Sequence, residues 1–184
     1  MRRNDRAVTD PLEITNIMSR CEVLHLAIAA EPAPYLLPVN FGMEPDGLTL
    51  YVHGAMEGTK YGLLARNPRV GFEMECTGGL VLDEAGHSCT MNYESVMGWG
   101  TVSEVTDPAE KLHALDCIMR QYHSEEFPYN PAVGERTRIL CLNIQERTGK
   151  RRVKLLGGRT SHPSDPAYAG PPPLTGETLG GNKC

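Results

Sequence analysis

The sequence predicts a mainly β (α+β) fold, a six-stranded antiparallel barrel with a few flanking helices. Six segments alternate apolar and polar residues with the period of two that is typical of half-buried strands. Most of them are separated by hairpin-length connections rather than by helices, which disfavours a parallel sheet. The 184 residues, 40% of them apolar, are enough for one domain with a core of its own.

Two of the predicted helices begin at the same type of signal. The segments 10–13 and 107–110 both read Asp-Pro-x-Glu, which offers an Asp cap, a proline at the first helical position and a glutamate at the third. Apolar residues then recur at helical spacing, and the second helix is expected to run to about His123. A short helix is predicted from Thr59 to Arg66, because the residue before Pro68 disfavours helical backbone.

The predicted strands are 24–28, 35–41, 48–52, 70–74, 91–102 and 140–144. A turn at Glu44-Pro45-Asp46-Gly47 joins the second strand to the third. The fifth strand is long enough to bend, with Gly98 and Gly100 as the natural points. The segment 77–88 is rich in glycine and does not resemble a tight hairpin.

Composition changes once along the chain. Glycine and proline supply 11 of the 30 residues from 155 to 184, against 22 of the 154 residues before them. Such a segment cannot sustain a helix or a central strand. We therefore expect a folded domain at residues 1–154 and a Gly/Pro-rich tail at residues 155–184, which is either disordered or extended along a partner subunit.

The net charge and the spacing of the cysteines argue against several classes of protein. A net charge of −5 argues against binding to nucleic acid or to an anionic membrane, and no apolar run approaches the roughly 18 residues of a membrane span. The six cysteines form no C-x-x-C pair, which favours reduced, mostly buried thiols in a cytoplasmic protein. We expect no metal site, since His87 beside Cys89 has no matching second pair.

The stretch most informative about function runs from the end of the third strand into the short helix. Here a helix N-terminus, Gly58, the hydroxyl of Thr59 and the cation of Lys60 can form a cradle for a phosphate. The alternative is a plain loop in which Thr59 caps the helix and Lys60 is solvated. Residue chemistry alone favours the loop, because the segment is neither a Walker loop nor G-x-G-x-x-G.

Other candidate positions are ambiguous in the same way. In the predicted strand, His53 is on the face opposite to the apolar residues Leu50 and Val52. Its imidazole can therefore donate a hydrogen bond to a ligand, or it can simply be exposed. His25 is interpreted as structural. Trp99 can stack on a ligand or pack at a dimer seam, and we favour the seam. The basic residues at 150–152 and 154 can neutralise an anionic ligand or end a strand in solvent.

Several short segments, taken in order, are similar to one known family. They are 2–6 with Asp10-Pro11, 38–42, 50–55 with Gly58-x-Lys60, 67–70, 93–100 and 148–150. Together they resemble the nitroimidazole-resistance (Nim-like) branch of the pyridoxamine 5'-phosphate oxidase-like superfamily, from about residue 2 to about residue 154. The resemblance implies an FMN-binding split barrel, and a homodimer with two FMN sites at the interface, each built from both subunits.

The positions to which the resemblance assigns cofactor binding are Val39, Asn40, His53, Gly54, Thr59, Lys60, Ser95, Val96 and Lys150. The first two would contact the flavin ring, those from 53 to 60 would line the ribityl-phosphate end, and 95 and 96 would contact the cofactor from the long strand. In the alternative interpretation, Lys150 contacts no cofactor and the segment that contains it simply ends the last strand. Gly54 is a departure, because family members often carry a serine there.

The expected function is that of an FMN-dependent oxidoreductase that reduces a small acceptor such as a nitroaromatic. His53 is the first candidate for a catalytic residue. A flavin- or haem-binding protein without turnover is the alternative from another class, with His25, His53 or a cysteine as the haem ligand. A deazaflavin-dependent reductase on the same fold is the third possibility.

Overall fold

A computed structural model describes residues 4–83, 86–123, 128 and 133–153. The chain divides into two compact units, one of residues 1–76 and 94–151 and the other of residues 77–93 and 152–184. All nine predicted cofactor positions belong to the first unit. The predicted tail at residues 155–184 lies outside the described residues, so its boundary at residue 154 stays a prediction.

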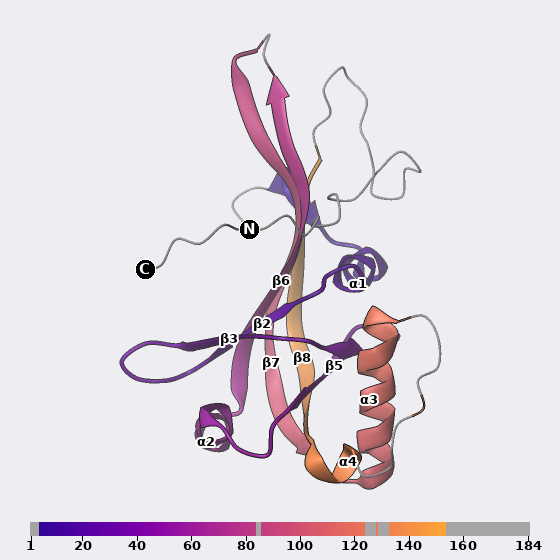
Figure 1. Cartoon of the computed structure of the whole chain (residues 1–184). Coiled ribbons are helices and arrows are strands. Elements are labelled where there is room, and N and C mark those ends of the chain that lie inside the picture. Colours follow the sequence, from indigo (N-terminus) through magenta and orange to yellow (C-terminus); the bar gives the residue numbers. More distant parts are fainter. Residues whose placement is uncertain (1–3, 84–85, 124–127, 129–132, 154–184) are drawn as a thin grey trace, which may run out of the picture. The chain divides into compact units, whose positions relative to one another are not determined.

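The elements in chain order are the 3-10 helix η1 (Asn4–Arg6), β1 (Ala7–Val8), α1 (Pro11–Met18), β2 (Leu24–Ile28), β3 (Tyr35–Val39), β4 (Gly42–Met43), β5 (Thr49–Gly54), α2 (Thr59–Arg66), β6 (Arg69–Asp83), β7 (Ser88–Val105), α3 (Pro108–Tyr122), α4 (Val133–Arg136) and β8 (Arg138–Arg152). Figure 1 shows their arrangement.

The predicted helix starts are confirmed. Asp10 Oδ1 accepts a hydrogen bond of 3.0 Å from the amide of Leu12, and Asp107 Oδ1 accepts one of 2.9 Å from the amide of Glu110. α2 has the predicted bounds, but its cap is Gly58 and not Thr59. These signals succeed because a cap and a proline act within one helical turn and need no distant partner.

The described strands form one sheet in the order β3-β2-β6-β7-β8-β5-β4, with β1 paired to β8. β3 and β4 stand at the two ends of this order, although only Asn40 and Phe41 separate them in sequence. One continuous segment therefore pairs with β2 through its first half and with β5 through its second half. This joins the two ends of the sheet and closes it into a barrel.

The described strands number eight, where six were predicted. The two additional ones, β1 and β4, have two residues each. β4 arises because the predicted strand 35–41 is interrupted: the amide of Phe41 donates to Tyr122 Oη at 3.0 Å instead of to a neighbouring strand. Since Tyr122 lies at the end of α3, 81 residues away, the interruption has no local sequence signal.

β6 and β7 are longer than predicted. The glycine-rich segment 77–88, which did not resemble a tight hairpin, instead continues β6 to Asp83 and contains the start of β7 at Ser88. The weak strand propensity of its glycines is overridden because each strand satisfies its backbone groups against the other.

Apolar side chains gather in two clusters of the first unit. The larger one fills the barrel with Leu24, Leu26, Ile28, Leu50 and other residues of the inward-facing stripes. The smaller one lies between α3 and the outer face of β5 and β8, and it consists of Tyr51, Val105, Ala114, Leu115, Cys117, Ile118, Ile139 and Cys141. α3 thus covers strand residues that alternation alone would leave in solvent (Figure 1).

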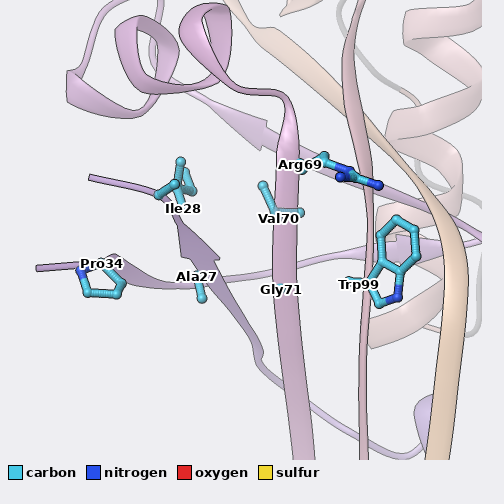
Figure 2. Close-up of a pocket in the computed structure, with 8 residues that line it drawn as sticks. Ala27, Ile28, Pro34, Arg69, Val70, Gly71 and Trp99 are labelled. Carbon is cyan, nitrogen blue, oxygen red and sulfur yellow. The ribbon is translucent and has the colours of Figure 1, made fainter. Parts of the chain in front are cut away.

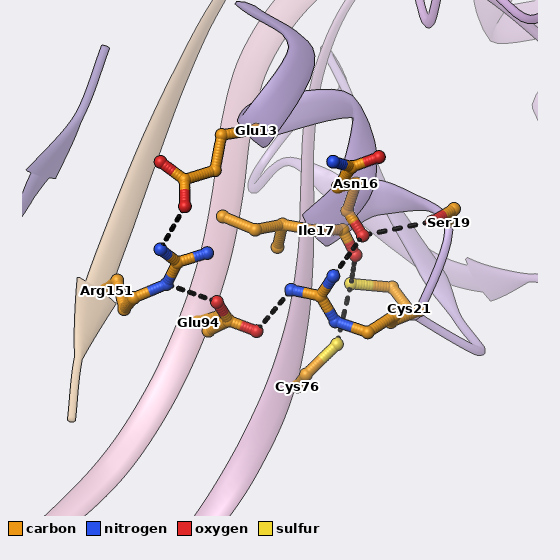
Figure 3. Close-up of polar contacts among 9 residues, drawn as sticks. Glu13, Asn16, Ile17, Ser19, Cys21, Cys76, Glu94 and Arg151 are labelled. Carbon is orange, nitrogen blue, oxygen red and sulfur yellow. Dashed lines mark hydrogen bonds and ion pairs between the residues drawn. The ribbon is translucent and has the colours of Figure 1, made fainter. Parts of the chain in front are cut away.

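A buried carboxylate connects α1 to the sheet. Glu94 of β7 is 5% exposed and accepts from Arg20 Nη2 at 2.5 Å. Its other oxygen pairs with Arg151 of β8, which also pairs with Glu13 of α1 (Figure 3). Arg151 is therefore engaged within the fold, which differs from both sequence interpretations of this residue, a cation for an anionic ligand and a strand end in solvent.

We expect Glu94→Gln to lower the free energy of unfolding by about 1.5 kcal/mol. The substitution keeps the volume but leaves two arginines without their shared charge, and the loss stays below the value for a fully buried pair because Arg20 is partly exposed. Urea denaturation measures it. The control is Glu75→Gln, an exposed glutamate of β6, which should shift stability by no more than about 0.5 kcal/mol. Equal effects in the two variants would contradict the structural role of Glu94.

The five described cysteines are free thiols. Cys21, Cys117 and Cys141 are buried as predicted, whereas Cys89 is exposed. Cys21 Sγ and Cys76 Sγ lie 3.2 Å apart and share a hydrogen bond (Figure 3). That bond raises the pKa of the Cys21 thiol and lowers the pKa of Cys76.

Candidate cofactor site

A cluster of cations forms where β5 ends and α2 begins. Arg138, the first residue of β8, lies directly opposite Gly54 in the β5–β8 register. Two cations approach the ring of Tyr61, with the Arg138 guanidinium 3.8 Å and Lys60 Nζ 4.5 Å from its centroid. We call this group, with Gly58 and Thr59, the cationic corner.

The two cations of the cationic corner differ in their freedom to bind a ligand. Arg138 forms a bidentate pair with Glu104 and donates to the carbonyl of Met56 at 3.2 Å. The same hydrogen-bonded pairing lowers the pKa of Glu104. Lys60, by contrast, forms no ion pair with any residue that the structure describes. Lys60 is therefore the cation available to an anion.

The N-terminus of α2 adds hydrogen-bond donors. Its cap, Gly58, has φ 152° and ψ 157°, a conformation that is essentially restricted to glycine. No side chain in the described part of the chain caps the helix with a hydrogen bond. The first amide groups of an uncapped helix, together with its dipole, favour an anion. The residues present fit a phosphate group, and this favours the cradle over the plain loop.

The departure at Gly54 has a structural explanation. A Cβ atom at this position would lie 2.8 Å from Tyr61 Oη and 2.9 Å from Lys60 Nζ. Tyr61 Oη in turn donates to the carbonyl of Ala55 at 2.6 Å, which holds the ring in place. Lys60 and Tyr61 thus occupy the space that a serine side chain would need.

His53 and Asn40 lie near the cationic corner. His53 is exposed and faces away from the barrel interior, as the alternation predicted. β4 and β5 are antiparallel, and Gly42 pairs with Tyr51. Two residues before Gly42 and two residues after Tyr51, Asn40 and His53 therefore lie at the same end of the two strands. Val39 ends β3 opposite Leu24. Five of the predicted positions, 40, 53, 54, 59 and 60, therefore belong to one end of β5.

Three other predicted positions, Ser95, Val96 and Lys150, form a separate group. Lys150 pairs with Ala7 of β1, twelve residues along β8 from Arg138, which corresponds to about 40 Å of strand. Ser95 and Val96 of β7 are near this distant end, since the neighbouring Glu94 pairs with Arg151. The Val96 side chain is fully buried in the barrel core, so only its main chain can face a ligand. Within one chain the nine positions do not converge.

A second feature is an apolar hollow on the outer face of β2, β6 and β7. Two adjoining depressions of about 490 and 440 Å³ share Ala27, Gly71 and Trp99 as lining residues. Figure 2 shows Trp99 and Arg69 on one side of the first depression. The guanidinium of Arg69 lies 5.1 Å from the indole centroid, and Trp99 Nε1 donates to Glu146 Oε2 at 3.2 Å. Small residues at positions 27 and 71 leave room for a flat surface to approach.

α2 connects the cationic corner to the hollow along the chain. Lys60 is near the start of the helix, and Arg69 follows its last residue by three positions. The helix itself is about 12 Å long. Sequence reasoning missed Arg69, Tyr61 and Arg138. Arg69 was within one of the matched segments, 67–70, but Arg138 reaches the corner only through strand pairing.

The comparisons with known proteins place this chain. The family model described as pyridoxamine 5'-phosphate oxidase matches residues 10–151. The chain belongs to this family. A candidate 5-nitroimidazole antibiotic resistance protein from Bacteroides thetaiotaomicron is 32% identical, with 79% of this chain and 86% of that chain covered and a TM-score of 0.71. The superfamily and the split-barrel class expected from the sequence are therefore confirmed.

Two more distant solved structures share the fold. The flavocytochrome Anf3 from Azotobacter vinelandii has a TM-score of 0.70 at 20% identity, with 100% of this chain and 91% of that chain covered. A FAD- and heme-binding protein from Mycobacterium smegmatis has a TM-score of 0.65 at 16% identity, covering 91% of this chain and 94% of that chain. The search of curated proteins found no match.

None of the helices in the described part of the chain has the length and apolar character to span a membrane. The cytoplasmic location inferred from the cysteines stays a prediction.

Proposed function

We propose that this pyridoxamine 5'-phosphate oxidase family member is an FMN-dependent oxidoreductase that transfers electrons to a small acceptor such as a nitroaromatic. The observation that carries the proposal is the cationic corner, where the N-terminus of α2 meets a lysine that has no ion pair with a described residue. A flavin phosphate carries close to two negative charges. Helix N-terminal amides and lysine side chains are groups that bind such an anion. The 32% identical resistance protein supports the choice of acceptor.

Bound FMN would supply the electron-transfer chemistry. The chain's own residues would hold and orient it: Lys60 and the α2 amides at the phosphate, and Asn40 toward the ring. His53, exposed beside the corner, is the candidate to hold or deliver a proton to the acceptor.

We further propose that the site is completed by a second copy of the chain. Two observations support this. Eight of the nine predicted cofactor positions fall into two groups far apart along β8, and both groups can contact one flavin only if a partner contributes one of them. The hollow also exposes Leu36, Met97 and Trp99, with 70%, 54% and 37% of each residue in solvent, an apolar surface of the kind that subunits cover.

The test is to purify the protein, denature it and identify the released cofactor by chromatography, with sedimentation of the native protein alongside. We expect FMN, and a native mass about twice the 20.2 kDa of the chain. A haem spectrum would support the haem-binding alternative, and a deazaflavin would support the third. A protein that neither contains FMN nor takes it up would overturn the proposal, and a flavin-loaded monomer would overturn the shared site.

A further inference from the structure

Three metal-ligating side chains meet on the outer side of the barrel, and none of them is among the positions assigned above. Glu44 lies in the turn after β4, and His113 and Cys117 lie four residues apart on the same face of α3. His113 Nε2 is 2.5 Å from Glu44 Oε1 and 3.5 Å from Cys117 Sγ, and Cys117 Sγ is 4.0 Å from the same Glu44 oxygen.

We infer that Glu44, His113 and Cys117 bind a divalent transition-metal ion of the Zn²⁺ type. A thiol, an imidazole and a carboxylate together suit a borderline-soft cation, whereas Mg²⁺ and Ca²⁺ prefer oxygen ligands alone. Three protein ligands leave one position of a tetrahedral ion for water or another donor.

The arrangement is that of a metal site rather than of a catalytic triad. In a Cys–His–carboxylate triad, the thiol and the carboxylate contact opposite nitrogens of the imidazole, so that the carboxylate orients the ring. Here Glu44 and Cys117 both approach Nε2. The three donor atoms therefore surround one point in space, as ligands of a single ion do.

The distances between donor atoms are close to those of a filled site. Zinc bonds of about 2.3 Å to sulfur and about 2.1 Å to nitrogen or oxygen place tetrahedral ligands about 3.4–3.6 Å apart. The sulfur–nitrogen distance of 3.5 Å already has this value, and the sulfur–oxygen distance of 4.0 Å is slightly longer. The His113–Glu44 hydrogen bond would have to open by about 1 Å, which side chains 48% and 24% exposed can accommodate.

Neighbouring groups support the ligands. Tyr51 Oη donates to Glu44 Oε1 at 3.2 Å, and Arg120 Nη2 donates to Cys117 Sγ at 3.3 Å. Donors of this kind orient metal ligands and stabilise their charge. On binding, a metal–sulfur bond replaces the S–H bond of Cys117 and the thiol proton goes to solvent. His113 binds the ion through the Nε2 lone pair, so its ring hydrogen moves from Nε2, where it faces Glu44, to Nδ1. No oxidation state changes. Burial raises the pKa of Cys117, so the thiol proton is present before the ion arrives.

The sequence predicted no metal site, because it contains no paired local metal-binding motif. The spacing of His113 and Cys117 is common on ordinary helices, and Glu44 is 69 residues before His113. Only the packing of α3 on β4 brings the three together. A bound ion would link these two elements and stabilise the outer cluster.

The test is equilibrium dialysis of the purified, cofactor-containing protein against micromolar Zn²⁺, followed by metal analysis. We expect one equivalent per chain, and an affinity that falls about tenfold or more in His113→Ala and in Cys117→Ser. The matched controls are Cys141→Ser, another buried thiol of the same cluster, and His25→Gln, a histidine paired with Glu73; both should keep wild-type binding.

Circular dichroism identifies variants that fail to fold. Because His113 is half exposed, His113→Ala should fold, and this variant decides the outcome if Cys117→Ser does not. The inference is overturned if the wild-type chain takes up no stoichiometric zinc, if uptake survives His113→Ala, or if Cys141→Ser loses zinc as completely as Cys117→Ser.

Discussion

Gly42→Ala is expected to lower the free energy of unfolding by about 3 kcal/mol. A Cβ atom at position 42 would lie 2.2 Å from the amide nitrogen of Ile118 and 2.3 Å from the carbonyl carbon of Cys117. Both are main-chain atoms of α3, so no side-chain rotation relieves the overlap. The helix must move away from β4, and the cluster that it forms with β5 and β8 loosens.

The matched control is Gly62→Ala. Gly62 lies within α2, and a Cβ atom there meets nothing within 4 Å. Alanine is the better helix former, so this variant should gain about 0.5–1 kcal/mol. Urea denaturation of both variants gives the comparison. If Gly42→Ala is as stable as the wild-type protein, the close contact of α3 with β4 is wrong.

Lys60→Ala is expected to weaken FMN binding about thirtyfold, equivalent to about 2 kcal/mol. The variant removes the one cation of the corner that forms no ion pair with described residues, and with it a charge-assisted hydrogen bond to the phosphate. Titration of the cofactor-free protein with FMN, followed by the change in flavin fluorescence, measures the affinity.

Two controls separate a phosphate contact from a general loss of structure. Riboflavin lacks the phosphate, so its affinity should be the same in Lys60→Ala and in the wild-type protein. Arg66→Ala removes a cation from the last turn of the same helix and should change FMN affinity no more than about twofold. Unchanged FMN binding in Lys60→Ala, or an equal loss for riboflavin, would refute the phosphate assignment.

The zinc measurement is independent of these flavin tests. Glu44, His113 and Cys117 share no residue with the cationic corner, so the failure of one proposal leaves the other intact. If both hold, the chain carries a cofactor site at the start of α2 and a metal site under α3. The metal would then stabilise the packing of α3. Its removal should lower the melting temperature of the protein and leave the flavin content unchanged.

The amino-acid sequence determined those features whose causes are local. The starts of α1 and α3 follow from an Asp cap and a proline within one turn, and the end of α2 follows from the proline two residues after it. The barrel class follows from a period of two repeated over six segments. The donors of the proposed phosphate cradle lie within a few residues of one another, so the sequence could present the cradle as a candidate, although residue chemistry alone favoured a plain loop.

Only the tertiary structure decided the features that depend on residues far apart in the chain. Tyr122 interrupts the strand at Phe41 from 81 residues away, and strand pairing brings Arg138 opposite Gly54. The packing of α3 buries the outer face of β5 and brings Glu44 to His113. The physical reason is common to all of them: periodicity and caps specify which face of an element is apolar, but which partner covers that face is set by the closure of the whole barrel.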